Sequence, residues 1–246
     1  MNRFFVKREN ITDGQIIVTG EDVQHISKVL RLDKGDSIIL CDGEGTDYTV
    51  KILEMDKQSV WTDIIKKEPS QGEPDIEVVL YQGIPKSTKM DLIIQKCTEM
   101  GINRIVPVFT VRTIVKLESE KDERKKVERW TKIAEEAAKQ SGRGVVPTIG
   151  MPVAMSEALV DAAKLDRIII PYELEASISI KRALAGDKVR SIGYFIGPEG
   201  GFEPDEVLKA KAAGAVPVTL GSRILRTETA GIVVLASIMY QYDQLK

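Results

Sequence analysis

The sequence predicts an α/β fold in which a mostly parallel sheet is covered by helices on both faces and is preceded by a small β-rich domain. Short apolar runs alternate with helical segments from residue 76 onward, a pattern typical of parallel sheets. Earlier in the chain, β-type runs alternate with turn signals. A polar stretch with two prolines and a glycine, residues 68–74, separates the two patterns and predicts a linker.

Residues 1–72 are predicted to form the first domain, a barrel-like module. One helix is expected at about residues 21–32, because Val23, Ile26 and Val29 recur at helical spacing. The β-type runs lie at residues 15–19, 37–41, 48–55 and 60–66. This domain is too small to hold much chemistry, but a basic edge on it would suit RNA.

Residues 73–246 are predicted to form the second domain. Its strands are expected at residues 76–82, 104–109, 167–171, 191–196 and 216–220. Its helices are expected at residues 89–100, 122–140, 155–163, 178–185, 204–213 and 227–242. Gly101 and Gly214 stand where helices should end, and Pro204 suits a first helical turn. The last helix is apolar on nearly every face, so it must be covered by its own sheet and by another subunit.

The composition excludes several classes of protein. The 246 residues carry a formal net charge of −2, so any contact with nucleic acid must be local. The longest apolar stretch is far shorter than the roughly 20 residues of a membrane helix, and no secretory signal opens the chain. We therefore expect a cytoplasmic protein with no membrane partner. Cys41 and Cys97 are expected to be small buried residues, and the single histidine, His25, has no carboxylate cluster beside it, so no metal site is predicted.

Two glycine-containing loops in the last quarter of the chain predict a ligand pocket. Residues 196–202 read IGPEGGF and residues 220–230 read LGSRILRTETA, and each loop follows an apolar run and precedes a helix. Loops at the carboxyl ends of neighbouring strands let bare backbone approach a flat ligand. The dinucleotide fingerprint and the phosphate-loop lysine are both absent, which disfavours a nucleotide-dependent oxidoreductase. Glu199 at the mouth of the first loop favours a neutral or positively charged ligand.

These loops belong to a wider set of motifs that resembles a known family. The others are RFFV and HISKVLRLDKGD near the N-terminus, KSTKMDLIIQKCTEMGINRIVPV at residues 86–108 and AEEAAKQSGRGVVPTI at residues 134–149. In this order they resemble the RsmE-type bacterial 16S ribosomal RNA uracil-N3 methyltransferases of the SPOUT superfamily. The resemblance implies a PUA-like barrel, a SPOUT α/β domain with a C-terminal trefoil knot, and a homodimer with its active sites at the subunit interface.

The same resemblance implies a reaction and its partners. The methyl donor would be S-adenosyl-L-methionine, a phosphate-free cation that agrees with the two loops, and no metal would be required. The acceptor would be N3 of one uridine, uracil 1498 by resemblance, in 16S ribosomal RNA of the small ribosomal subunit. Two alternatives stay open at this point. They are a methyltransferase of the same superfamily that acts on another ribosomal or transfer RNA nucleotide, and a non-catalytic RNA-binding factor in ribosome assembly.

Site residues follow from the loops and from the resemblance. The cofactor set comprises Ile196, Gly197, Gly200, Gly201, Leu220, Gly221, Ile224, Leu225 and Ala230. The resemblance implies an RNA-facing set on the barrel that comprises Arg3, Arg8, His25 and Arg31, although for His25 alone a histidine packed on its small helix is slightly favoured. Lys86 and Lys89 are further candidates for RNA phosphate or the partner subunit, and an exposed amphipathic helix explains them almost as well.

The chemistry of a uracil imide suggests the catalytic residues. N3 becomes a good nucleophile once it loses its proton, and the charge then spreads to O2 and O4, where a fixed guanidinium would stabilise it. Arg226 is the first candidate and Arg143 the second. Glu199 would take the proton if burial raised its pKa. The alternative for Arg226 is a surface pair with Glu228, and Glu199 could instead order its loop or pair with Arg226.

Overall fold

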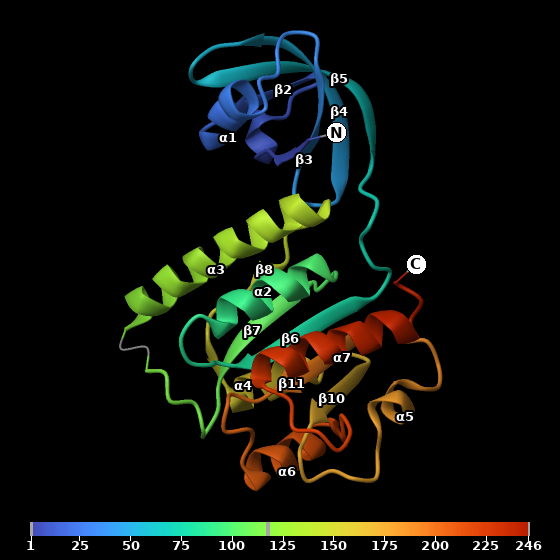
Figure 1. Cartoon of the computed structure of the whole chain (residues 1–246). Helices are drawn as coiled ribbons and strands as arrows, with labels where there is room; N and C mark the ends of the chain where they lie inside the picture. The colour runs from blue at the N-terminus through green and yellow to red at the C-terminus, as the bar shows by residue number, and fades with distance from the viewer. Residues whose placement is uncertain (1, 117–118, 246) are drawn as a thin grey trace. The chain divides into compact units, whose positions relative to one another are not determined.

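The computed structural model describes residues 2–116 and 119–245, which form two compact units (Figure 1). Unit 1 comprises Met1–Glu73 and Ala138–Val146, and unit 2 comprises Pro74–Ala137 and Pro147–Lys246. The sequence division leaves residues 138–146 in the second domain, but they group with unit 1. They do so because they bond to the first 73 residues of the chain: Gly45 N donates to Gly144 O at 3.2 Å, and Lys139 pairs with Asp22 at 3.4 Å.

Unit 1 is built on a five-stranded sheet in the order β1-β3-β4-β5-β2. Its strands are β1 (Arg3–Phe5), β2 (Gln15–Thr19), β3 (Ser37–Cys41), β4 (Thr46–Met55) and β5 (Ser59–Pro69). β1 runs parallel to β3, and the other pairs are antiparallel. Alternate residues face one core, as the buried Ile16 and Val18 of β2 show. The predicted runs at 15–19 and 37–41 are confirmed, whereas the three-residue β1 was too short to predict.

The helical part of unit 1 is shorter than predicted. A 3₁₀ turn, η1 (Arg8–Asn10), precedes β2. The helix expected over 21–32 is α1 (Glu21–Gln24) continued by a π-helical turn, η2 (His25–Val29). It ends because Arg31 takes a left-handed φ of 53°.

Unit 2 contains a seven-stranded sheet in which every pairing is parallel. The order is β12-β10-β11-β6-β7-β8, with β9 also paired to β7. The strands are β6 (Glu77–Gly83), β7 (Arg104–Phe109), β8 (Thr148–Ile149), β9 (Val153–Ala154), β10 (Arg167–Pro171), β11 (Ser191–Ile196) and β12 (Val216–Val218). The predicted parallel sheet is confirmed, and β8 and β9 were missed because two residues carry no periodicity.

Helices cover both faces of this sheet, as predicted. They are α2 (Lys89–Glu99), α3 (Glu120–Ser141), α4 (Met155–Ala162), α5 (Ile180–Leu184), α6 (Pro204–Ala212) and α7 (Thr227–Gln241). On one face the stacked rings of Tyr81 and Phe195, 4.5 Å between centroids, pack in a core with α4 and α6. On the other face α2 and α7 lie side by side (Figure 1), and the buried Tyr194 hydroxyl donates to Gly231 O of α7 at 3.3 Å.

None of the helices in residues 2–116 and 119–245 has the length and apolarity needed to cross a membrane. Within the same ranges, no three His, Cys, Asp or Glu side chains gather as a potential metal site. Cys41 and Cys97 are both buried free thiols, as predicted.

Candidate functional site

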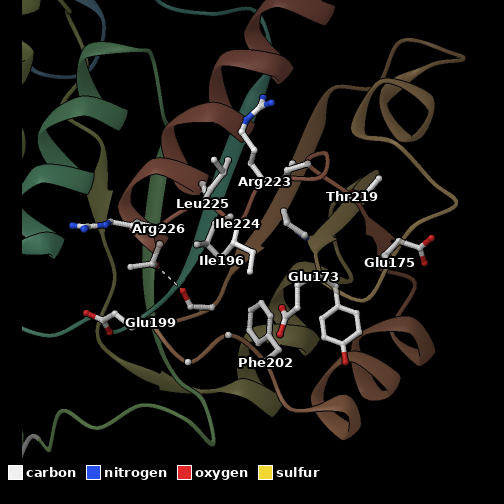
Figure 2. Close-up of a pocket in the computed structure, with 18 of the residues that line it drawn as sticks. Glu173, Glu175, Ile196, Glu199, Phe202, Thr219, Arg223, Ile224, Leu225 and Arg226 are labelled. Atoms are coloured by element: carbon white, nitrogen blue, oxygen red, sulfur yellow. Dashed lines mark hydrogen bonds between the residues drawn. The ribbon is translucent and has the colours of Figure 1, made fainter.

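A pocket of about 890 Å³ lies at the carboxyl ends of three neighbouring strands of unit 2 (Figure 2). Its walls come from the segments that follow β10, β11 and β12, together with the first residues of α7. All nine residues of the predicted cofactor set line it: Ile196, Gly197, Gly200, Gly201, Leu220, Gly221, Ile224, Leu225 and Ala230. The structure therefore brings the predicted set together, and the binding of a cofactor by it stays a prediction.

The glycines of the first loop are required by close backbone contacts. A Cβ on Gly197 would lie 2.9 Å from the carbonyl carbon of Gly201, which is closer than real Cβ atoms come. Gly83, at the end of β6, would place a Cβ 2.6 Å from Pro198 Cδ. Gly201 also has a left-handed φ of 70°. The loop is thus folded tightly on itself, and its backbone is open to the pocket.

An arginine that sequence reasoning missed braces this loop. Arg112 donates to the Gly200 carbonyl and, through Nε, to Glu203 Oε1 at 2.8 Å. Its stem also explains Gly200, where a Cβ would meet Arg112 Cβ at 3.1 Å. Arg112 comes three residues after the predicted strand at 104–109. It could therefore have been predicted from the rule that ligand-binding residues follow the carboxyl ends of parallel strands.

The Glu199 carboxylate is an acceptor for the start of α2. Lys89 Nζ donates to it at 2.7 Å and Lys86 N at 3.1 Å. Burial raises the pKa of Glu199, but the hydrogen bonds from Lys89 and from backbone N–H groups lower it by more, so the net shift is downward. This direction opposes the predicted role of Glu199 as a base, and Lys89 is paired with Glu199.

Arg226 immediately precedes α7 and is exposed at the pocket wall. Its side chain makes no hydrogen bond or ion pair with the residues that the structure describes. The alternative expected for Arg226, a pair with Glu228, is not observed. Glu228 pairs instead with Lys89 at 3.9 Å. Figure 2 shows Arg226 and Glu199 on the same side of the pocket, while Arg223 points elsewhere.

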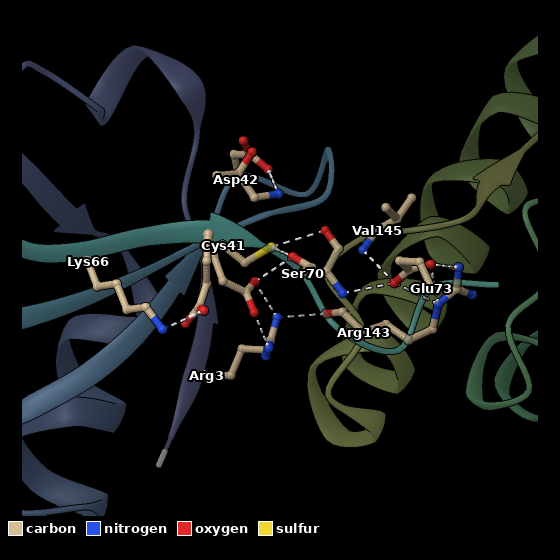
Figure 3. Close-up of polar contacts among 12 residues, drawn as sticks. Arg3, Cys41, Asp42, Lys66, Ser70, Glu73, Arg143 and Val145 are labelled. Atoms are coloured by element: carbon tan, nitrogen blue, oxygen red, sulfur yellow. Dashed lines mark hydrogen bonds and ion pairs between the residues drawn. The ribbon is translucent and has the colours of Figure 1, made fainter. Parts of the chain in front are cut away.

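Arg143 has a different environment from Arg226. It belongs to unit 1, is only 3% exposed, and pairs with Glu73 at 2.6 Å (Figure 3). Glu73 also accepts from the N–H groups of Gly144 and Val145, at 2.9 and 3.1 Å. A guanidinium held this way is occupied by a structural partner, which opposes the predicted catalytic role of Arg143.

The predicted RNA set divides into exposed and buried members. Arg3 is held by Asp47 in a two-pronged ion pair, at 2.5 and 2.7 Å, and its side chain is 13% exposed (Figure 3). This pair opposes an RNA-facing role for Arg3. Arg8, His25 and Arg31 are exposed, with Arg8 near Glu44 at 3.3 Å and the His25 ring edge-on to Phe4. Lys86 is exposed as well.

Two carboxylates after β10 also line the pocket and were not predicted. Glu175 accepts from Ser177 N at 2.7 Å and from Ile178 N at 3.1 Å, so it holds its own loop. Glu173 lies over the first glycine loop, with Oε2 3.3 Å from where a Gly201 Cβ would be. Both glutamates could have been predicted from the sequence, because they follow a predicted strand at the same edge of the sheet as the glycine loops.

Comparisons with known proteins agree with this geometry. A family model described as an RNA methyltransferase domain matches residues 72–239, and one described as an RNA methyltransferase PUA domain matches residues 18–65. The chain is 35% identical to ribosomal RNA small subunit methyltransferase E of Bacillus subtilis, over 100% of this chain and 99% of that protein. The protein of that name from Synechocystis is 30% identical, over 96% of this chain and 76% of the relative.

Solved structures resemble the whole chain. The crystal structure of ribosomal RNA small subunit methyltransferase E from Neisseria gonorrhoeae, bound to S-adenosyl methionine, has a TM-score of 0.84 at 30% identity, covering 98% of this chain and 97% of that one. A putative methyltransferase from Legionella pneumophila, in complex with the same cofactor, has a TM-score of 0.85 at 28% identity, covering 97% and 96%.

Proposed function

The chain belongs to the ribosomal RNA small subunit methyltransferase E family, and on that premise we propose that it methylates N3 of one uridine in 16S ribosomal RNA with S-adenosylmethionine as donor. Membership of the family identifies this uridine as U1498. The observation that carries this proposal is the pocket itself, in which all nine predicted cofactor residues meet at the carboxyl ends of parallel strands. Relatives of the same fold bind S-adenosylmethionine, which supports this ligand.

The pocket residues suit this donor, and the first glycine loop lacks the lysine that a phosphate-binding loop would carry. S-adenosylmethionine, when bound, supplies the methyl group of its sulfonium. Once that methyl group is transferred, the rest of the molecule leaves as a neutral thioether. The open backbone and short side chains around Gly197 and Gly221 would take the flat and aliphatic parts of the ligand. The pocket wall carries charges of both signs: Glu199 is paired with Lys89 at 2.7 Å, whereas the Glu173 carboxylate lies over the first glycine loop, where it would attract a cation.

On the substrate side, stabilisation of the uracil anion is the central task. As the N3–methyl bond forms and the sulfur–methyl bond breaks, the imide must already have lost its N3 proton to solvent water. Arg226, exposed and without a protein partner among the described residues, can direct its guanidinium at O2 or O4 of that anion. The pKa of Glu199 is lowered beside Lys89, so its carboxylate is a weak base. Its contacts suit it instead to order the glycine loop and the start of α2.

We also propose that the enzyme acts in the cytoplasm and that it is a homodimer. The homodimer is supported by α7 and the adjoining α2, whose solvent side exposes Val233, Tyr240 and Leu92. The family fold implies a trefoil knot, and the return of the chain from the edge strand β12 to α7 over β6 and β11 supports it. Arg8, His25 and Arg31 remain the RNA candidates of unit 1, and the reaction uses no metal.

Methyl transfer to small ribosomal subunits that lack native modifications tests this function. The full chain and labelled S-adenosylmethionine are incubated with the subunits, and nuclease digestion with mass spectrometry locates the label. We expect N3-methyluridine at a single 16S site. Label at another nucleotide would keep the enzyme class and overturn the target, whereas cofactor binding without any transfer would indicate a binding-only factor.

A further inference from the structure

Two local irregularities meet beneath the pocket. Arg226 occupies the position before α7 where Ser, Thr, Asp or Asn usually caps a helix, and its side chain makes no capping hydrogen bond. Thr227, the next residue, carries a hydroxyl group, but this hydroxyl donates to the Gly197 carbonyl and does not cap the helix. The second irregularity is Gln82, which is completely buried and has one amide oxygen without a hydrogen-bond partner among the described residues. Such departures from local rules often mark functional positions.

Gln82, Thr227 and Gly197 form one buried chain of hydrogen bonds, and Thr227 directly follows Arg226. Gln82 Nε2 donates to Thr227 Oγ1 at 2.9 Å, and Thr227 Oγ1 donates to the Gly197 carbonyl at 2.6 Å. Gln82 also donates to Gly83 O at 2.9 Å, which sets the orientation of its amide. The hydroxyl of Thr227 thus has one acceptor and one donor, and its proton is directed at Gly197.

This chain connects the parts of the pocket that must stay in register. Gln82 comes from β6, Gly197 begins the first glycine loop after β11, and Thr227 starts α7 directly after Arg226. We propose that the Thr227 hydroxyl, oriented by Gln82, is a positioning group that holds the glycine loop and Arg226 in their ligand-binding arrangement before the ligand arrives. The inference rests on the proposed function, because it assigns that pocket to S-adenosylmethionine.

The unpartnered Gln82 oxygen is the cost of this arrangement. A buried amide oxygen without a partner destabilises a fold, and an apolar residue of similar size would avoid that. The Gly197 carbonyl can only accept, so the Thr227 hydroxyl is the donor of that bond, and the Gln82 N–H occupies the acceptor side of the same hydroxyl, which an apolar residue would leave empty. The position therefore favours preorganisation of the pocket over stability.

Substitutions of Thr227 test the inference in the full chain. Thr227→Val keeps the shape and removes the hydroxyl, and Thr227→Ser keeps the hydroxyl. Calorimetry is expected to show roughly tenfold weaker S-adenosylmethionine binding for Thr227→Val and near wild-type binding for Thr227→Ser. Without ligand, amide hydrogen exchange in residues 197–202 should be faster in Thr227→Val than in the wild type.

A matched control separates positioning from simple loss of stability. Thr62 is a fully buried threonine of unit 1 whose hydroxyl donates to Ile16 O at 2.8 Å, so Thr62→Val removes an equivalent bond away from the pocket residues. We expect Thr62→Val to lower stability in urea and to leave the ligand Kd unchanged. Gln82→Met should weaken binding less than Thr227→Val, and the double variant should show less than the sum of both effects.

Either of two results would overturn the inference: wild-type affinity in Thr227→Val, or equal losses in Thr227→Val and Thr227→Ser. If Thr227→Val does not fold, wild-type affinity and exchange in Gln82→Met would overturn it instead. A wild-type chain that binds no S-adenosylmethionine would overturn the proposed function first, a result that is distinct from a selective failure of the variants.

Discussion

Arg226 combines exposure, a pocket position and the absence of a protein partner within the described ranges. Arg3 and Arg143, by contrast, are each paired with a carboxylate at low exposure. We expect Arg226→Ala to lower kcat about a hundredfold or more, since removal of one transition-state donor has that effect, and to change the Kd of S-adenosylmethionine little. Single-turnover methylation and calorimetry measure the two quantities. Equal losses in both would identify a binding residue.

Glu199 makes a stability contribution that depends on pH. Its pKa is lowered from 4.5 in the folded chain, so the pair with Lys89 stabilises the fold fully above about pH 4.5, and this contribution is lost as the pH falls through the folded pKa. Glu199→Gln should therefore lower the free energy of unfolding near neutral pH, and the difference from the wild type should narrow toward about pH 4. Urea unfolding at several pH values checks this, and a difference that grows in acid would contradict it.

Arg143 tests the distinction between a buried structural arginine and a catalytic one. Removal of its guanidinium leaves the Glu73 carboxylate without its main counter-charge, and breaking a buried pair of this kind costs about 3 kcal/mol. We expect Arg143→Ala to lower the free energy of unfolding by about that amount in urea. Arg8→Ala, which breaks an exposed pair, is the control and should change stability little. Normal stability with lost turnover would restore the catalytic role.

The glycine loop is the element that gives the pocket its shape. Gly197→Ala places a methyl group against the backbone of Gly201, so the loop must shift, and we expect at least about tenfold weaker S-adenosylmethionine binding by calorimetry. Gly150→Ala is the matched control in the same unit, because the nearest atom to its new Cβ would be 3.6 Å away. Comparable losses in the two variants would show that the loop has no special constraint.

The whole molecule is expected to be a dimer through the exposed side of α7. Light scattering at micromolar concentration should give twice the mass of one chain, and Tyr240→Glu should shift it toward the mass of one chain, because Tyr240 is 78% exposed on that side. Leu208→Glu places the same charge at another exposed apolar position, on α6, and should leave the dimer intact. A wild-type mass of one chain would exclude the proposed assembly.

The sequence by itself determined the local features of this protein. Hydrophobic periodicity and turn residues depend on neighbours in the chain, so the strands and helices of unit 2 and the two glycine loops could be predicted. Elements of two or three residues, such as β1, β8 and β9, contain too little pattern for this. The strand-end rule also predicted that the residues of the two glycine loops would line one pocket, because parallel strands place their carboxyl ends at one edge of the sheet.

Only the tertiary structure decided which charged groups meet. Lys89 and Glu199 are 110 residues apart, Glu73 and Arg143 are 70 apart, and Arg3 and Asp47 are 44 apart. Periodicity has no information at such separations, so a paired arginine and a free one look alike in the sequence. The structure separates them because Arg3 and Arg143 contact a carboxylate at low exposure, whereas Arg226 is exposed at the wall of the pocket.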